Sequence, residues 1–147
     1  MKKYCFVFAR GGSKGIANKN LMKIYKTTLV GHSINFAKKL NIFDQIFLSS
    51  DNDQILEIGY KSKINLIKRP KNLSLDHSPE WKAWQHAVNF ANKFYGKFQT
   101  FVSLPPTAPL RENIDVLNSI KKINQCDAVI TYKKSHSNPW FNMVSYK

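Results

Sequence analysis

The first twenty residues constrain the fold more than any other part of the chain. An apolar run, Tyr4–Phe8, leads directly into a loop in which residues 11–15 hold three of the six glycines. Such a run indicates a strand buried on both faces, as in a parallel sheet. Glycine lets backbone N–H groups approach an anion closely, and Arg10, Lys14 and Lys19 would neutralise that anion. The stretch predicts a polyphosphate cradle, although it has neither Walker A nor G-x-G-x-x-G spacing.

Strands and helices alternate through most of the chain. Apolar runs predict further strands over Gln45–Ser49, Ile64–Ile67, Thr100–Leu104 and Ala128–Tyr132, with another beginning in Trp140–Val144. Periodicity and capping residues predict helices over Thr28–Leu40, Asp53–Lys61, Pro79–Tyr95 and Asn113–Asn124, the last two capped by Ser78 and Asn113. The alternation predicts an α/β fold with a doubly wound, mostly parallel sheet, in a single domain over residues 1–147.

Ligands of such sheets bind beyond the carboxyl ends of the strands. Five loops are expected at that edge: the glycine loop, Ser49–Asn52, Lys68–Ser78, Pro105–Arg111 and Lys133–Asn138. Most of them hold unusual polar or rigid residues. We therefore expect these loops to converge on one crevice.

Arginines and lysines in these loops are the first candidates for binding an anion. Arg10 enters the glycine loop, where a guanidinium can hold phosphate through two hydrogen bonds. Lys14 and Lys19 are each either phosphate ligands or solvated surface charges. Arg69, at a strand end before Pro70, is either a nucleotide contact or a surface charge.

Several other polar residues leave two interpretations open. Asp76 and Ser78 would act on a substrate or simply order their loop and cap a helix. Asp51 would bind a metal or cap a helix, and no metal ligand set is evident around it. His86 is expected in the core or an interface, and the lone His136 is a weak candidate for a base.

Charge and composition exclude several classes of protein. The formal net charge is +14, but the lysines are scattered and no basic run or nucleic-acid motif appears, which favours a small polyanionic substrate over nucleic acid. No apolar run is long enough to cross a membrane, so no membrane partner is expected. Cys5 and Cys126 lack CxxC spacing, which is typical of reduced thiols in a cytoplasmic protein.

Several motifs together carry a family resemblance. They are Ala9–Ile16 with Lys19-Asn20, Ser49-Ser50-Asp51, Arg69-Pro70, Leu73 with Asp76, Pro106–Arg111 and Asn138–Asn142. Their order and spacing resemble those of the acylneuraminate cytidylyltransferases, the CMP-sialic acid synthetase family. The resemblance implies a fold like that of nucleotide-diphospho-sugar transferases. It also implies that CTP and a sialic-acid-like nonulosonate react to give a CMP-sugar and pyrophosphate, with Mg²⁺ as cofactor.

The resemblance also implies roles for individual residues. Arg10 and Lys19 would be catalytic, because they would hold the triphosphate and stabilise the departing pyrophosphate. The implied nucleotide-binding residues are Ala9, Arg10, Gly11, Gly12, Ser13, Asn20, Arg69 and Ser78. Thr107 and Arg111 would face the sugar.

The chain departs from the family pattern in three places. Ala17 replaces a usual proline, and Pro105 replaces a glutamine that is associated with the acceptor sugar. The chain also stops at Lys147, whereas relatives continue. We therefore expect an incomplete domain, with the Mg²⁺ ligands beyond the chain end and the arm of a homodimer beginning near residues 135–147. A non-catalytic nucleotide- or partner-binding remnant and a basic nucleic-acid-binding module are the alternative hypotheses.

Overall fold

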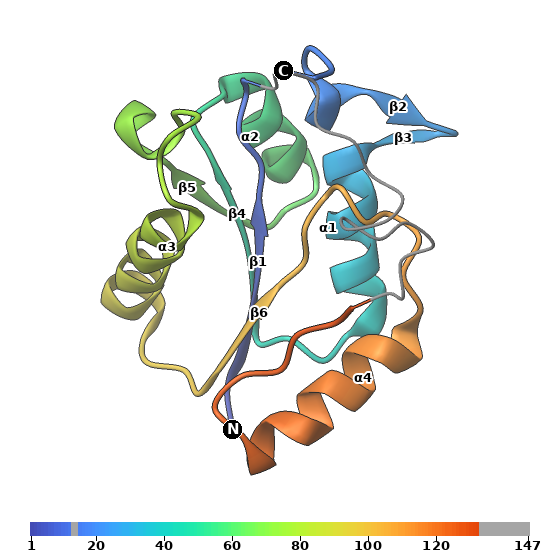
Figure 1. The fold of residues 1–147 in the computed structure, drawn as a ribbon, viewed down its shortest axis with the longest axis vertical. Helices are drawn as coiled ribbons and strands as arrows, with labels where there is room; N and C mark the ends of the chain where they lie inside the picture. Colours follow the sequence, from blue (N-terminus) through green and yellow to red (C-terminus); the bar gives the residue numbers. More distant parts are fainter. Residues whose placement is uncertain (13–14, 133–147) are drawn as a thin grey trace, which may run out of the picture. The chain divides into compact units, whose positions relative to one another are not determined.

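The computed structural model describes residues 1–12 and 15–132. The chain divides into two compact units, Met1–Arg111 and Glu112–Lys147. The first unit is built on a parallel sheet in the order β5-β4-β1-β6 (Figure 1). Its strands are β1 (Lys3–Phe8), β4 (Gln45–Ser50), β5 (Asn65–Lys68) and β6 (Thr100–Ser103). The predicted doubly wound, mostly parallel sheet is therefore confirmed.

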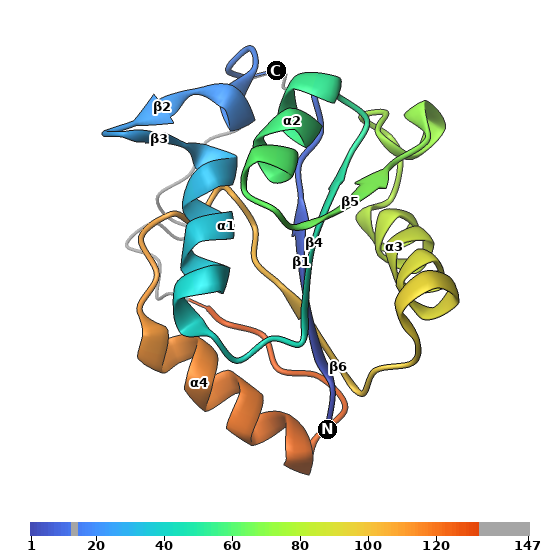
Figure 2. The same ribbon diagram turned by 180° about the vertical axis from the view of Figure 1, so that it is seen from behind.

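Helices cover both faces of this sheet. The long ones are α1 (Leu29–Leu40), α2 (Asp53–Lys61) and α3 (Glu80–Tyr95). Figures 1 and 2 show α1 and α2 on one side and α3 on the other. Short elements that the sequence did not reveal are the 3₁₀ turns η1 (Lys19–Leu21) and η2 (Lys71–Leu73), and a hairpin of β2 (Lys23–Ile24) with β3 (Thr27–Thr28).

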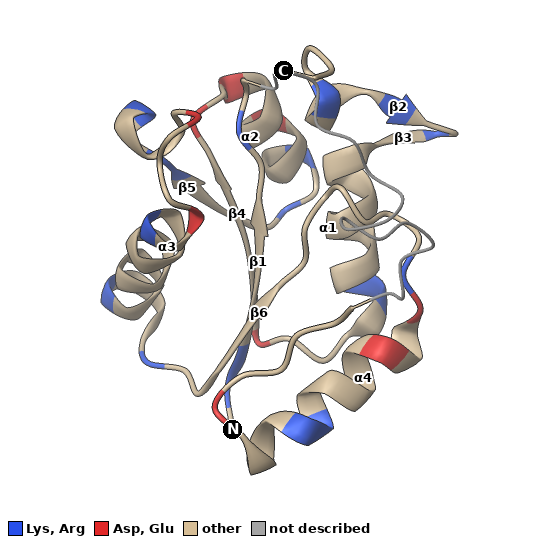
Figure 3. Ribbon diagram, viewed as in Figure 1, with Lys and Arg blue, Asp and Glu red and all other residues tan. Residues whose placement is uncertain are grey.

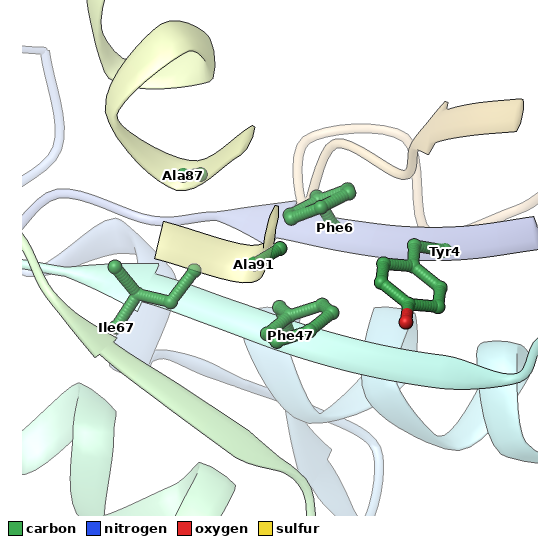
Figure 4. Packing of buried hydrophobic residues seen from close by; sticks show 6 residues of the cluster. All are labelled: Tyr4, Phe6, Phe47, Ile67, Ala87 and Ala91. Carbon is green, nitrogen blue, oxygen red and sulfur yellow. The ribbon is translucent and has the colours of Figure 1, made fainter. Parts of the chain in front are cut away.

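The alternation of side chains along β1 gives the sheet a core on each face. Tyr4 and Phe6 are fully buried on the α3 side, where they form a cluster with Phe47 of β4 (Figure 4). The rings of Phe6 and Phe47 stack with centroids 5.0 Å apart. Ala87 and Ala91 of α3 complete the cluster, and their small side chains let the helix lie close to these aromatic rings.

The opposite face of β1 carries Cys5 and Val7, which are also fully buried. Burial raises the pKa of the Cys5 thiol far above its usual range, so this thiol stays protonated and inert. Gly59 of α2 packs so closely that a Cβ there would lie 2.6 Å from a methyl carbon of Leu66. Close packing on both faces fixes the positions of the strand ends.

Local signals placed most element boundaries correctly. Asn52 caps α2 by accepting a hydrogen bond from the Ile55 N–H, and Gly96 ends α3 with a positive φ of 88°. The predicted cap at Ser78 is wrong, because Pro79 occupies the cap position and the Ser78 hydroxyl donates instead to the Asn72 carbonyl, 2.5 Å away. The Ser78 hydroxyl is therefore bonded within its own loop and makes no capping hydrogen bond to α3.

The second unit contains α4 (Asn113–Lys122) and the 3₁₀ turn η3 (Ile123–Gln125). The cap of α4 is Glu112 rather than Asn113, which already lies inside the helix. The predicted strand Ala128–Tyr132 is wrong, because these residues form no strand in the structure. Ile130 is 84 % exposed, and the segment has no backbone partner among the described residues, so nothing offsets the entropy of ordering it. The predicted strand in Trp140–Val144 lies outside the described residues.

Candidate functional site

A cleft of about 630 Å³ lies beyond the carboxyl ends of β1, β5 and β6. Its lining comprises Phe8, Arg10, Gly15, Ile16, Lys19, Asn20, Arg69, Leu73–Asp76, Ser78, Glu80, Ala83 and Pro105–Thr107. Three of the five predicted loops therefore meet there, as expected. The Ser49–Asn52 loop joins them through a hydrogen bond to Gly11. The fifth loop, Lys133–Asn138, lies outside the described residues.

The glycine loop is anchored to the end of β4. The Ala9 N–H donates to the Ser49 carbonyl at 3.0 Å, which extends the sheet ladder by one bond. The Gly11 N–H donates to Asp51 Oδ1 at 3.0 Å, and a Cβ on Gly11 would lie 2.9 Å from the Asn52 Cβ. Among the described residues, apart from its neighbours in the chain, no atom lies within 4 Å of where a Cβ on Gly12 would stand. The loop thus needs glycine at position 11 for close approach, while position 12 is accessible to a ligand.

Arg10 links the glycine loop to the loop after β5. Its Nη1 lies 2.8 Å from Asp76 Oδ1, and both side chains are more than a third exposed. The Arg10 carbonyl accepts a hydrogen bond from the Asn20 amide at 3.0 Å. Of the two open interpretations of Asp76, the structure supports the one in which it orders loops. Arg10 itself lines the cleft, as its predicted role requires.

Arg69 is the most unusual cation of the site. Its side chain is 6 % exposed, and its Nε and Nη2 have no hydrogen-bond partner among the described residues. Burial lowers the pKa of this guanidinium, whereas the Asp51 carboxylate, 3.9 Å from Nη2, raises it. Buried donors are almost always paired, so these two nitrogens are available to an acceptor that enters the cleft.

The remaining predicted residues fall into two groups. Lys19, Asn20, Ser78 and Thr107 line the cleft. Arg111 does not line it. Its two terminal nitrogens donate to the Ser33 hydroxyl at 3.1 Å and to the Pro105 carbonyl at 2.5 Å, and its guanidinium carbon lies 5.4 Å from the centre of the Phe36 ring. The sugar-binding role of Arg111 stays a prediction, because here it holds the loop that carries Thr107.

Ser13 and Lys14 lie outside the described residues. His86 is half-buried on α3 and does not line the cleft. Its Nδ1 is buried without a partner, and its pKa is lowered by burial and by the nearby Arg69. This position fits the structural role that the sequence suggested for it.

Two acidic residues near the cleft, Asp76 and Asp51, already have partners. Asp76 pairs with Arg10, and Asp51 accepts from Gly11 close to Arg69. Among residues 1–12 and 15–132, no three His, Cys, Asp or Glu side chains gather where they could hold a metal ion. The described residues therefore supply no all-protein metal site, and the predicted magnesium stays a prediction.

Asp51 is the site residue whose role the sequence left open and the structure defines. It is not the helix cap, because Asn52 takes that position. The sequence offered one indication of this role, because Asp51 directly follows β4, and β4 pairs with β1, which leads into the glycine loop. Its partner Gly11 is 40 residues away in the sequence, so the contact could not be inferred locally.

The fold and the cleft define an α/β protein with a cation-lined site at the carboxyl edge of its sheet. The chain matches the cytidylyltransferase family over residues 4–136, and it belongs to that family. This membership confirms the resemblance found in the sequence. In the described part of the chain, no helix has both the length and the apolar character needed to cross a bilayer.

The chain is also similar in sequence to individual proteins. The chain is 32% identical to post-translational flagellin modification protein B of Campylobacter coli, over 95% of this chain and 61% of that protein. It is 38% identical to a pseudaminic acid cytidylyltransferase of Campylobacter jejuni, over 75% of this chain and 48% of that enzyme. The chain thus spans about half to three-fifths of the length of these relatives.

A solved structure supports the fold independently of close sequence identity. A CMP:2-keto-3-deoxy-manno-octonic acid synthetase, determined with CTP, superposes with a TM-score of 0.68 at 16% identity. The match covers 88% of this chain and 50% of that one. At this identity the likeness establishes the shared fold alone.

Proposed function

We propose that this chain forms the CTP-binding part of a cytidylyltransferase that activates a sialic-acid-like nonulosonate. The observation that carries the proposal is Arg69, a buried cation with unpaired donors that lines the same cleft as the glycine loop. The names of the relatives, which include a pseudaminic acid cytidylyltransferase, support the choice of nucleotide and sugar class. In the reaction, the anomeric hydroxyl of the sugar attacks the α-phosphorus of CTP, and pyrophosphate leaves.

The cations and polar side chains that line the cleft suit the phosphates and the nucleoside of CTP. Arg10 and Lys19 lie in the glycine loop and its 3₁₀ turn, where they would bind the triphosphate and offset the charge of the departing pyrophosphate. Asn20, Arg69 and Ser78 would contact the cytidine. Phosphoryl transfer of this kind depends mainly on positioning and electrostatics, so these cations would be the main catalytic groups of the described residues.

Arg69 also provides a reason for choosing cytosine. A guanidinium only donates hydrogen bonds, and the O2 and N3 atoms of cytosine both accept them. Uracil presents an N3–H donor at the same edge, which would leave an Arg69 donor buried and unpaired. An unpaired buried donor costs about 1–3 kcal/mol, so we expect CTP to bind roughly 5- to 150-fold more tightly than UTP.

The direct test is calorimetric titration of the purified chain with CTP and UTP. We expect Arg10→Ala to weaken CTP binding by about tenfold, because a hydrogen bond from a charged group contributes about 1.5–3 kcal/mol. Lys39→Ala removes an exposed cation near the end of α1, outside the cleft lining, and serves as the matched control. Equal affinity for CTP and UTP, or equal losses in both variants, would contradict the assignment.

Turnover is a separate measurement. Pyrophosphate release would be followed with CTP, pseudaminic acid and Mg²⁺. We expect weak or no release from the 147-residue chain, because Asp76 of the cleft lining is paired with Arg10 and no cluster of three metal-ligating side chains occurs among the described residues. Robust release would contradict this expectation while leaving the nucleotide assignment intact. Sugar contacts by Thr107 and Arg111, magnesium dependence and homodimer formation remain part of the proposal.

A further inference from the structure

The segment Ser50–Asn52 at the end of β4 contacts both the glycine loop and Arg69. The Ser50 hydroxyl accepts a hydrogen bond from the Asn52 N–H at 3.1 Å. The Asn52 side chain in turn accepts from the Ile55 N–H at 3.1 Å, at the first turn of α2. Asp51 stands between Ser50 and Asn52 in the chain, and these two hydrogen bonds order the backbone on either side of it.

Asp51 contacts both halves of the site through a single oxygen. Its Oδ1 accepts the Gly11 N–H at 3.0 Å, on the phosphate side. The same Oδ1 lies 3.9 Å from Nη2 of Arg69, on the nucleoside side. The Asp51 side chain is 20% exposed, and Arg69 is 6 % exposed, so solvent screens this pair less than a surface pair.

Backbone contacts tie the same three segments together. The Ala9 N–H donates to the Ser49 carbonyl at 3.0 Å, and the Arg69 N–H donates to the Ser50 carbonyl at 2.8 Å. Gly11 packs directly against the Asn52 side chain. The end of β4 is therefore the common support of the glycine loop and of Arg69.

We propose that Asp51 is a positioning residue that couples the triphosphate half of the site to the cytidine half. It holds the Gly11 peptide in the orientation that leaves Gly12 open to phosphate, and it orients the buried guanidinium of Arg69 toward the nucleoside. This inference rests on the proposed function, because it assigns a residue to the same site.

Whether anion affinity rises or falls when Asp51 is substituted distinguishes a positioning role from simple electrostatic repulsion. A carboxylate close to a phosphate site repels the ligand, so removing its charge would by itself strengthen anion binding. Loss of a positioning contact has the opposite effect, because the glycine loop must then be ordered when the anion binds.

Two variants of Asp51 separate its contact with Gly11 from its contact with Arg69. Asp51→Asn keeps an oxygen that can accept from Gly11 but removes the charge beside Arg69. Asp51→Ala removes both contacts. Asp53→Asn is the matched control, because Asp53 is 89% exposed at the start of α2 and pairs with Lys68, and neither residue lines the cleft.

The probes are inorganic tripolyphosphate and CTP, measured by calorimetry. The ratio of their affinities reports what the nucleoside adds to binding. We expect Asp51→Ala to weaken the binding of tripolyphosphate by about tenfold and to lower the ratio of CTP affinity to tripolyphosphate affinity. We expect Asp51→Asn to bind tripolyphosphate as tightly as the wild type and to lower only the affinity ratio. Asp53→Asn should change neither quantity.

An independent readout is the Gly11 amide proton in the ¹H–¹⁵N spectrum of the free protein. Its hydrogen-bonded shift should persist in Asp51→Asn and be lost in Asp51→Ala. If Asp51→Ala does not fold, the CTP to tripolyphosphate ratio and the Gly11 shift of Asp51→Asn decide the question.

Three results would overturn the coupling. They are tighter tripolyphosphate binding by Asp51→Ala, an unchanged affinity ratio in both Asp51 variants, or equal losses in Asp53→Asn. Each of these can occur while the wild-type chain still binds CTP, in which case the proposed function stands. A wild-type chain that binds no CTP would overturn the proposed function and the coupling with it.

Discussion

Arg10 has a partner that competes with the proposed ligand. In the structure its guanidinium pairs with Asp76, and both side chains are more than a third exposed. A triphosphate that binds Arg10 must displace this carboxylate or share the cation with it. The ion pair thus links the two loops in the free protein and would compete with an anion for Arg10.

Asp76→Asn should therefore strengthen anion binding. An exposed ion pair contributes about 0.2–1 kcal/mol, so we expect tripolyphosphate to bind up to about fivefold more tightly. The measurement is calorimetric titration at fixed ionic strength, with Asp53→Asn as the control for a change of net charge. Weaker binding by Asp76→Asn would mean that ordering the loop matters more than freeing the cation.

The environment of His86 is expected to make the stability of the fold depend on pH. Burial and the nearby Arg69 lower the pKa of this imidazole in the folded state. The unfolded chain therefore binds the proton more readily, and folding stability is retained above the ordinary histidine pKa of about 6.5 and lost as the pH falls below it.

The check is urea unfolding of the wild type and of His86→Gln at several pH values between about 5 and 8. We expect the wild type to lose more stability than the variant as the pH falls through this range, because glutamine cannot take up a proton. Parallel pH profiles for the two proteins would show that His86 does not contribute to the dependence.

At the scale of single elements, α2 packs tightly against the sheet at Gly59. Gly59 lies so close to Leu66 and Leu48 that an added Cβ would meet their methyl groups at 2.6 and 2.8 Å. The helix ends at Lys61, and Asn52 caps its first turn next to Asp51. Any shift of α2 would therefore reach the end of β4 and the glycine loop.

Gly59→Ala is expected to destabilise the fold. Overpacking costs about 1–3 kcal/mol, and alanine returns about 1 kcal/mol of helix propensity, so a net loss of up to about 2 kcal/mol is expected in urea unfolding. Tyr60→Ala, at an exposed position of the same helix, is the matched control and should change stability little. A stabilised Gly59→Ala protein would show that the helix can move away from the sheet without penalty.

At the scale of the whole molecule, the charge is large but dispersed. Within Met1–Arg111, Lys and Arg residues are spread over η1, β2, α1 and α3 (Figure 3). The formal net charge of +14 still attracts polyanions at low salt. This general attraction has to be separated from binding in the cleft before either is interpreted.

Salt separates the two modes of binding. Dispersed surface charges are screened over about 8 Å at physiological ionic strength, whereas a partly buried cation such as Arg69 is screened less. We expect duplex DNA binding to weaken steeply between about 0.05 and 0.2 M salt, with CTP affinity falling much less. Binding and competition assays across this range provide the measurement. DNA binding that persists at high salt and is displaced by CTP would favour the nucleic-acid hypothesis.

Local sequence patterns predicted the sheet and its helices because each signal lies within one element. The apolar run of β1, the cap at Asn52 and the terminating Gly96 all act over a few residues. The same local logic failed at Ser78, whose hydroxyl found a nearer acceptor, and at Ala128–Tyr132, where apolar residues lack a partner in the described part of the chain. Strand formation needs a neighbour, and composition alone does not supply one.

The sequence by itself determined the parallel α/β framework, the glycine loop and the loops that meet at its edge. Only the tertiary structure decided which side chains face one another there. Arg10 meets Asp76 across 66 residues, and Gly11 meets Asp51 across 40. It also decided that Arg69 is buried with unpaired donors rather than exposed as a surface charge. The physical reason is that burial and pairing depend on the order of strands in the sheet, which brings together loops that are distant in the chain.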